Sequence, residues 1–337
     1  MNQIKLVSRP SIFSMTLMAS LLMQGCNSSN NEDNTLDNDP TSNLLPEGIT
    51  MVDIAGGSFN MGGDSMSGDS PDILVTISDF SISETEITND QYITFLNSAY
   101  QDGWISVEEQ NVIDPCGSYN EKVILGTSLS LHPNKILLQL GETGGCTSDG
   151  HPEHIDNKSW ISYSTENNSF ELIDDGKANW PVNWVKWYGA DTFANYYNVK
   201  LPTEAQWEYA AKAGSLNLEF ATDDGTLDSS KANYNGDLPG VYNPDGHSVA
   251  VKTYTPNSFG LYDMSGNVWE WCSDYYDADF YSDASTDPEN LTEPTTDPKR
   301  VRRGGSWNYH ASTLKTHARA SDYEDRGNNH FGFRIAM

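Results

Sequence analysis

The apolar residues of this chain come in short runs interrupted by glycine and proline. The sequence has 27 Gly and 15 Pro among 337 residues, and both residue types favour turns over long regular elements. Nine Trp, 17 Tyr and 37% hydrophobic residues supply enough large side chains for a packed core. We therefore expect one loop-rich folded domain rather than a helical bundle or a disordered acidic chain.

Three segments have the pattern of short amphipathic helices. Thr88 and Thr203 each precede a Gln by three positions, which is the spacing of a capping box, and apolar residues follow at helical intervals. The second of these helices is expected to end at Gly214. A third helical pattern runs from Trp187 to Tyr197.

Alternating apolar residues predict strands elsewhere. Residues 52–54 and 59–61 alternate on either side of a glycine turn, and 73–77 is a β-branched run. Residues 331–337 alternate to the last residue, so we expect a paired strand there. Within the less patterned region 104–177, which resembles an insertion, a hairpin is expected around Asn167 and Asn168.

The charge balance constrains the partners. The chain has 19 Lys and Arg against 48 Asp and Glu, so its net charge is 19 − 48 = −29. Nucleic-acid affinity comes largely from cationic side chains that displace counterions, so a nucleic-acid partner is excluded. The folded part should also stay away from anionic lipid head groups.

The N-terminus has the features of a secretory signal. Lys5 and Arg9 precede an apolar run over residues 12–23, which is shorter than the roughly 20 residues that span a bilayer. The run ends at Gly25-Cys26, which resembles a bacterial lipoprotein box, so residues 1–25 would be cleaved and Cys26 lipidated. The alternative is an ordinary secretion signal with an incidental cysteine.

The next segment, residues 26–47, is polar and has no apolar periodicity, so it is interpreted as a flexible tether to a domain over residues 48–337. Asn27 stands where an Asp would retain a lipoprotein in the inner membrane, and that resemblance favours the outer membrane. We expect a protein of the bacterial cell envelope that touches the membrane through its lipid anchor only.

Seven segments in this order resemble the motifs of one family: 57–62, 86–92, 181–187, 201–210, 259–271, 303–307 and 332–334. The chain is similar to the formylglycine-generating enzyme, or sulfatase-modifying factor, family from about residue 51 to its last residue. The resemblance implies a C-type-lectin-like α+β fold with little regular secondary structure, often stabilised by calcium.

The family's oxidase converts a sulfatase cysteine to formylglycine with a copper ion held by two cysteines after a Gly-Gly-Ser motif. Here Tyr309 and Leu314 stand at those two positions. Leu has no donor atom and a phenol is a hard ligand unsuited to soft Cu(I), so copper is not expected. Ser306 and His310 match the same motif; they either line a surviving pocket or serve as a turn residue and a hydrogen-bonded wall residue.

The resemblance also implies calcium. The family's ligands at one site would be Asp263, Glu270 and the carbonyls of Gly266 and Val268; at a second they would be Asn233, Asp245 and the carbonyls of Tyr234 and His247. Carboxylates and alternate carbonyls in one loop offer the oxygen ligands that calcium needs. The alternative is that these are ordinary loop residues of a very acidic protein.

The cysteines leave one pairing favoured. With Cys26 lipidated, Cys116, Cys146 and Cys272 remain. Cys116 and Cys146 lie beside glycines in the region 104–177, and we expect a disulfide between them, whereas a link from Cys116 to Cys272 would overturn that assignment. Cys272 is expected to be a buried thiol.

The sequence thus favours a calcium-binding, non-catalytic binding or assembly module that recognises a peptide, a glycan or an envelope protein. Two alternatives remain open: a formylglycine-generating oxidase or divergent oxygenase, and a structural envelope protein that works through oligomers.

Overall fold

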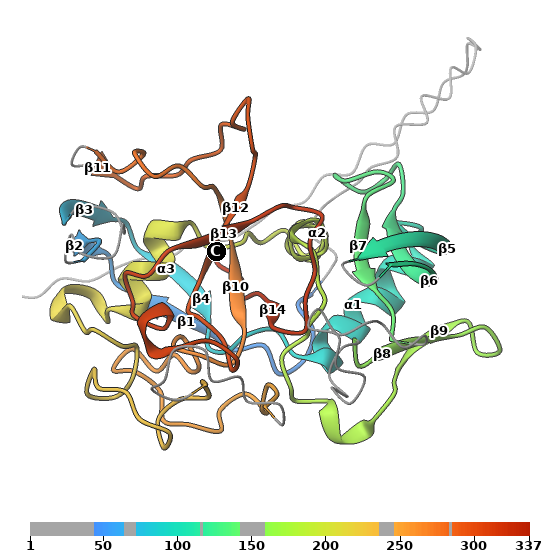
Figure 1. The fold of residues 1–337 in the computed structure, drawn as a ribbon, viewed down its shortest axis with the longest axis horizontal. Coiled ribbons are helices and arrows are strands. Elements are labelled where there is room, and N and C mark those ends of the chain that lie inside the picture. Colours follow the sequence, from blue (N-terminus) through green and yellow to red (C-terminus); the bar gives the residue numbers. More distant parts are fainter. Residues whose placement is uncertain (1–43, 64–71, 115–116, 142–158, 236–245, 283–284) are drawn as a thin grey trace, which may run out of the picture. The chain divides into compact units, whose positions relative to one another are not determined.

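A four-stranded sheet divides the core of the fold into two parts. The computed structural model describes residues 44–63, 72–114, 117–141, 159–235, 246–282 and 285–337. In it β10 (Trp269–Tyr275) lies between β12 (Arg300–Arg303), to which it is antiparallel, and β14 (Phe331–Gly332), to which it is parallel, and β13 (Ala320–Asp322) flanks β12. In Figure 1 this sheet lies between α3 and α2.

Side-chain alternation along β10 explains the division. Trp269 and Trp271 join the aromatic core that packs around α1 and α2, whereas Cys272 joins the core beneath α3. Successive side chains of a strand point to opposite faces of a sheet, so β10 supplies both cores from seven residues.

The predicted helices are confirmed among the described residues. They are α1 (Asn89–Gln101), α2 (Trp187–Tyr196) and α3 (Glu204–Ala211), and α1 and α3 begin with the predicted capping boxes. The expected end at Gly214 is wrong: Lys212 caps α3, Ala213 turns into the left-handed region at φ 51°, and Gly214 starts the 3-10 turn η2 (Gly214–Leu216). Two further 3-10 turns are η1 (Asp175–Lys177) and η3 (Ala311–Thr313).

The predicted N-terminal strands form, but in separate sheets. The strand β1 (Met51–Ile54) pairs with β4 (Phe80–Ser83), while β2 (Gly57–Met61) pairs with β3 (Ile73–Ile77), which also contacts β11 (Ser285–Thr286). In the connection from β1 to β2, Gly56 lies close to the end of β3. A Cβ on Gly56 would be 2.3 Å from the Ile77 carbonyl oxygen. This close approach carries the chain from one sheet to the other instead of closing a hairpin.

The described residues of region 104–177 form two antiparallel sheets. The strands β5 (Ile105–Asp114), β6 (Gly117–Gly126) and β7 (Ile136–Gln139) form one antiparallel sheet. The predicted hairpin is confirmed as β8 (Ile161–Ser164) and β9 (Ser169–Leu172), with Asn168 in the left-handed region at φ 54°. Asn97 of α1 holds this hairpin, because its amide bonds both the N–H and the carbonyl of Phe170.

The C-terminal residues are paired, as predicted. Met337 donates its N–H to the Ser81 carbonyl at 2.8 Å, and the Ser83 N–H bonds the Ile335 carbonyl at 2.8 Å. Phe331, Phe333 and Ile335 are buried in the aromatic core. The end of the chain therefore joins β4 to the central sheet.

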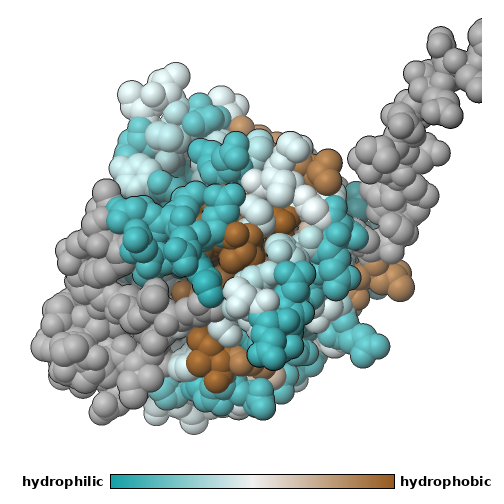
Figure 2. Space-filling view, turned by 90° about the vertical axis from the view of Figure 1, so that its right-hand side faces the viewer, coloured by the Kyte–Doolittle hydropathy of each residue, from teal (hydrophilic) through white to brown (hydrophobic). Residues whose placement is uncertain are grey.

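The surface seen from the side of β5, β6 and β7 is mostly hydrophilic, with apolar residues in separate patches (Figure 2). Within the described ranges, none of the helices has the length and apolarity required to cross a bilayer. The predicted signal peptide, Cys26 and most of the tether lie outside those ranges, as do Cys116 and Cys146.

Candidate functional site

The segment that follows β12 lies on the loop that precedes β10. Gly304 and Gly305 both have positive φ, at 96° and 73°, which side-chain-bearing residues rarely adopt. The Gly304 carbonyl accepts from the Gly266 N–H at 2.8 Å, and the Trp307 N–H bonds the Asn267 carbonyl at 2.9 Å. The double glycine thus fixes residues 304–314 against residues 263–268.

Hydrocarbon and aromatic packing occupy the two positions where the family resemblance places cysteines. Leu314 is fully buried, and its Cδ1 lies 2.6 Å from where a Cβ on Gly305 would be. The Tyr309 ring meets Trp269 and His330 edge-on, with centroids 5.4 Å apart in each case. Neither position offers a sulfur donor.

The two predicted pocket residues differ in exposure. Ser306 is fully buried, and its hydroxyl donates to Asn308 Oδ1 at 2.8 Å, while its carbonyl accepts the Tyr309 N–H in a tight turn. His310 is half-buried and caps η3, with Nδ1 accepting from the Ser312 N–H at 3.3 Å. The structure therefore places Ser306 in the turn and His310 at its edge.

The cysteine within the described ranges lies on the other face of the sheet. Cys272 is fully buried, as predicted, and burial raises the pKa of its thiol well above the usual value. It belongs to the core beneath α3, whereas Tyr309 packs on the opposite face against Trp269. Cys272 is therefore not a substitute for the missing sulfur ligands.

A group of buried donors surrounds Tyr309 and was not identified from the sequence. Arg302 is 7% exposed and lies over Phe331 and Trp269, at 4.0 and 5.2 Å from the ring centroids. Arg302 Nη2 lies 3.3 Å from Asp322 and from the Ser321 carbonyl, whereas its Nε and Nη1 atoms and the indole nitrogen of Trp269 have no hydrogen-bond partner within the described part of the chain. Unpartnered buried donors are costly, so this site suits a ligand rich in acceptors.

His330 beside this group is held neutral. Burial and the nearby Arg302 cation keep the pKa of His330 well below its usual range. Its Nδ1 lies 3.3 Å from the Asn308 amide and 2.8 Å from Asn329 Oδ1. A neutral imidazole leaves Arg302 as the cation at the site.

Three buried carboxyl groups share one guanidinium at the first predicted calcium site. Glu270 accepts from Arg334 through both oxygens, at 2.6 and 2.8 Å. Burial raises the pKa of Asp263 to about 6, and burial with the charges of Asp263 and Glu270 raises that of Glu86 well above its usual value. The raised pKa values show that these crowded carboxyl groups have too little positive charge nearby, and in a loop of hard oxygen donors they fit a divalent cation such as calcium.

Glu86 and Arg334 were both within motifs that the sequence singled out, yet neither received a role. Glu86 bonds the Asn267 amide at 2.9 Å and the Val268 N–H at 3.2 Å, so it reaches the predicted loop from 182 positions away in the sequence. No sequence spacing relates them; only the fold brings these residues together.

The second predicted calcium site is partly assembled. Asn233 Nδ2 donates to the His247 carbonyl at 2.8 Å. Turning the Asn233 side-chain amide by 180° exchanges Nδ2 and Oδ1, which would bring the amide oxygen next to this carbonyl. Tyr234 adjoins Asn233 in sequence, while Asp245 lies outside the described residues. Side-chain oxygens and carbonyls are suitable calcium ligands, so the residues present fit this ion.

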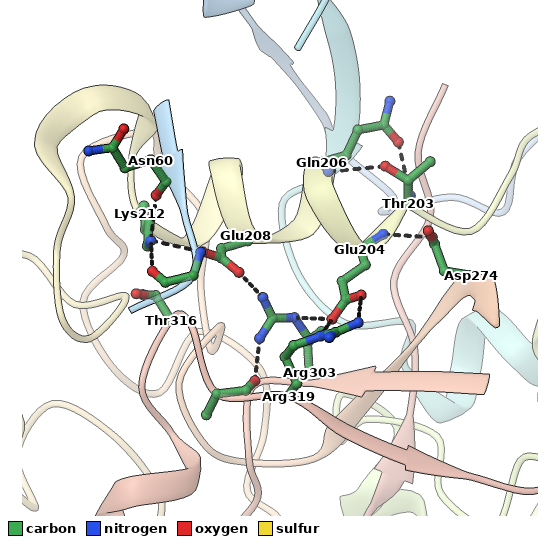
Figure 3. Close-up of polar contacts among 12 residues, drawn as sticks. Asn60, Thr203, Glu204, Gln206, Glu208, Lys212, Asp274, Arg303, Thr316 and Arg319 are labelled. Atoms are coloured by element: carbon green, nitrogen blue, oxygen red, sulfur yellow. Dashed lines mark hydrogen bonds and ion pairs between the residues drawn. The ribbon is translucent and has the colours of Figure 1, made fainter. Parts of the chain in front are cut away.

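Buried ion pairs anchor β12, and with it the double glycine, to α3 (Figure 3). Arg303 pairs with Glu208 and lies 3.3 Å from a Glu204 oxygen. Lys212 lies 2.8 Å from Glu208, and Arg319 holds both oxygens of Glu204 at 2.7 and 2.8 Å. All five side chains are nearly or fully buried, so the charges fix the approach of helix to strand.

Asp274, at the N-terminus of α3, gives a testable pH dependence. Burial, with the charge of Glu204, raises its pKa to about 7. The native state therefore retains a proton that the unfolded state has lost between about pH 4 and 7, and stability falls as pH rises through that window. We expect the free energy of unfolding of wild type to drop, relative to Asp274→Asn, by about 3 kcal/mol between pH 4 and 8.

Urea denaturation of both proteins at several pH values measures this difference. Asn in place of Asp274 adds a constant cost, because its amide faces the N–H of Glu204 or Asn290 at every pH. Parallel pH profiles of the two proteins would contradict the raised pKa.

Comparisons with known proteins agree with this geometry. The family described as Sulfatase-modifying factor enzyme 1-like domain matches residues 38–337. The formylglycine-generating enzyme of Streptomyces coelicolor is 31% identical over 301 residues, which cover 85% of this chain and 88% of that enzyme.

The chain is also similar to part of a kinase sequence and to a solved structure. Serine/threonine-protein kinase Pkn1 of Chlamydia trachomatis serovar L2 is 30% identical over 287 residues; the match covers 85% of this chain and 38% of the kinase, so the chain spans well under half of that protein. The structure of PvdO from Pseudomonas aeruginosa superposes with a TM-score of 0.57 at 21% identity, covering 85% of this chain and 93% of that one. That likeness supports the loop-rich α+β fold.

Proposed function

Since the chain belongs to the sulfatase-modifying factor family, we propose that it is a binding or assembly module of the bacterial cell envelope, without the oxidase chemistry of formylglycine-generating enzymes. The observation that carries this proposal is the pair of residues after the double glycine. Buried Leu314 and aromatic-packed Tyr309 stand where the oxidase needs two thiolates. A soft monovalent copper ion has no suitable ligand there.

The surroundings of Tyr309 support a binding role. Beside Tyr309, Arg302 and Trp269 have buried donor atoms without a hydrogen-bond partner among the described residues. A carbonyl- or carboxylate-bearing ligand, such as a peptide or an acidic glycan, would satisfy those donors. The donor atoms are covered, so a ligand reaches them only when neighbouring side chains move.

A turnover assay tests the absence of oxidase chemistry. The copper-treated protein is incubated with a peptide that carries a sulfatase motif, and mass spectrometry follows the conversion of cysteine to formylglycine. We expect an unchanged peptide mass, with an active formylglycine-generating enzyme as the positive control. Conversion of the peptide above the level of the protein-free reaction would show oxidase activity and contradict the binding-module proposal.

Calcium is part of the proposal. Asp263, Glu270 and the carbonyls of Gly266 and Val268 would hold the ion, and Glu86 would add a nearby carboxyl oxygen. Bound calcium would favour the ionised forms of Asp263 and Glu86, whose pKa values are raised although the Arg334 guanidinium lies nearby. We expect EDTA to lower the melting temperature by about 5 °C or more and added calcium to restore it.

A pair of variants assigns that effect to the loop. Asp263→Asn should lose most of the response to EDTA, whereas Asp279→Asn, at an exposed residue, should keep it. An EDTA response that is the same in all three proteins would remove calcium from this loop.

Lipidation at Cys26 would place the module at the outer membrane. The motif Gly25-Cys26 after the apolar run 12–23 supports this proposal. Fractionation of cells that produce wild type and Cys26→Ser tests it: we expect wild type with the membranes and the variant in the soluble fraction. Equal partition of the two would argue for an ordinary secretion signal.

A further inference from the structure

A polar cleft lies on the α2 side of β12, apart from the residues around Tyr309. Its volume is about 460 Å³, within the range of roughly 300–1,000 Å³ common for small-molecule sites. Its lining includes Asn195 and Asn198 at the end of α2, Lys200, Glu289, Leu291 and Arg300. None of the candidate site residues predicted from the sequence lines it.

The floor of the cleft is rigid. The Arg300 guanidinium lies between the rings of Trp187 and Tyr275, 3.7 and 3.5 Å from their centroids. It donates to Glu324 at 2.8 Å and to the Ser273 carbonyl at 2.6 Å. An arginine held by two rings and two acceptors changes little on binding, so little ordering entropy opposes a ligand.

The rim of the cleft carries polar groups that are available to a ligand. Asn195, Asn198 and Lys200 are exposed, and their side chains make no hydrogen bond to any described residue. An amide both donates and accepts, which matches a hydroxyl group that does the same. Glu289, which accepts from the Ser273 hydroxyl at 3.2 Å, adds an acceptor on the opposite side.

Most charged groups of the lining already have partners. Arg300 is bound by Glu324 and Asp191 by His132, which leaves Lys200 and Glu289 as two charges of opposite sign. A strongly charged ligand gains no net attraction from such a lining. Leu291 is 59% exposed, so it offers an apolar surface on which the C–H face of a sugar ring could pack.

We propose that this cleft binds a neutral oligosaccharide, whose hydroxyl groups would pair with the amides and Glu289 while Leu291 contacts a ring face. The proposal does not depend on whether the segment after the double glycine has any chemistry, because the two places share no residue.

Isothermal titration of the full chain with maltotetraose, cellotetraose, xylotetraose and chitotetraose tests the proposal. We expect at least one of the four to bind with a Kd below about 1 mM. Asn195→Ala and Lys200→Ala should each weaken that binding about fivefold, because each removes one or two hydrogen bonds. Both residues are exposed, and Ala favours the helical position of Asn195, so neither change threatens the fold.

Two controls locate the effect. Asn179→Ala removes an exposed amide outside the cleft, and His310→Ala changes the segment after the double glycine; both should bind as wild type does. Absence of binding by all four sugars at about 10 mM, or equal binding by wild type and both cleft variants, would overturn the proposal. Weaker binding by His310→Ala alone would move the sugar to the other site and overturn it as well.

Discussion

Replacing Arg334 by Met should lower the free energy of unfolding by about 4 kcal/mol, because it leaves buried carboxylates without their cation. Arg334 and Glu270 are both fully buried and meet at 2.6 Å. Asp263, whose pKa burial raises to about 6, adds a second carboxyl group at the same place, while burial raises the pKa of Glu86 well above its usual value and favours its neutral form. The guanidinium also donates to the carbonyls of Ser83 and Tyr262, so its loss removes one of the links between β4 and the central sheet.

Urea denaturation measures the loss, and two further variants assign it to charge. Arg326→Met removes an exposed arginine, whose side chain is 61% exposed, and should change stability by less than about 0.5 kcal/mol. Adding Glu270→Gln to Arg334→Met should recover part of the loss, because it removes one unpaired charge. A double variant even less stable than Arg334→Met would assign the loss to packing instead.

Replacing Arg303 by Met should cost about 3 kcal/mol, somewhat less than the loss at Arg334. Arg303 and Glu208 are fully buried, and the guanidinium also donates to the Ala318 carbonyl. The loss is smaller because Lys212 still neutralises Glu208 and Arg319 still neutralises Glu204. Arg303, and after it Lys212, hold the pKa of Glu208 below its usual range despite its burial.

A matched exposed pair provides the control for Arg303. Lys299 pairs with Asp297 at 2.7 Å on the surface near the same strand, and Lys299→Met should change stability by less than about 0.5 kcal/mol. Denaturation with urea compares the two variants with wild type. Equal effects of the two substitutions would contradict a supporting role for the buried network.

Elements that depend on interactions between residues close together in the sequence were predicted correctly. The capping boxes at Thr88 and Thr203 are complete in the structure, because each Gln lies within one turn of its Thr. The hairpin at Asn168 formed because a short turn fixes its own register. Burial of Cys272 was predicted from its place directly after Trp269-Glu270-Trp271, and the structure confirms it.

Features that depend on distant segments were not predictable in the same way. The partner of β1 is β4 rather than the neighbouring β2, a choice set by the close approach of Gly56 to Ile77. Glu86 reaches the loop before β10 through the fold alone, and Arg302 is placed beside Tyr309 by the pairing of β12 with β10. Long-range contacts of this kind leave no periodicity in a single sequence.

The sequence shows that residues 309 and 314 are Tyr and Leu, but it does not show which residues they contact. The structure adds that Leu314 fills the space against Gly305 and that Tyr309 closes over Trp269. These contacts make the substitutions part of the packing. The double glycine, which needs positive φ, is retained around them.

A cuprous-ion titration tests the central claim most directly. The full chain is titrated against a colorimetric Cu(I) competitor, beside Tyr309→Phe, His310→Ala and the double variant Tyr309→Cys with Leu314→Cys. We predict that the affinity of wild type equals those of Tyr309→Phe and His310→Ala, and that the two introduced cysteines raise it. Tight uptake by wild type that is lost in either Tyr309→Phe or His310→Ala would contradict the account.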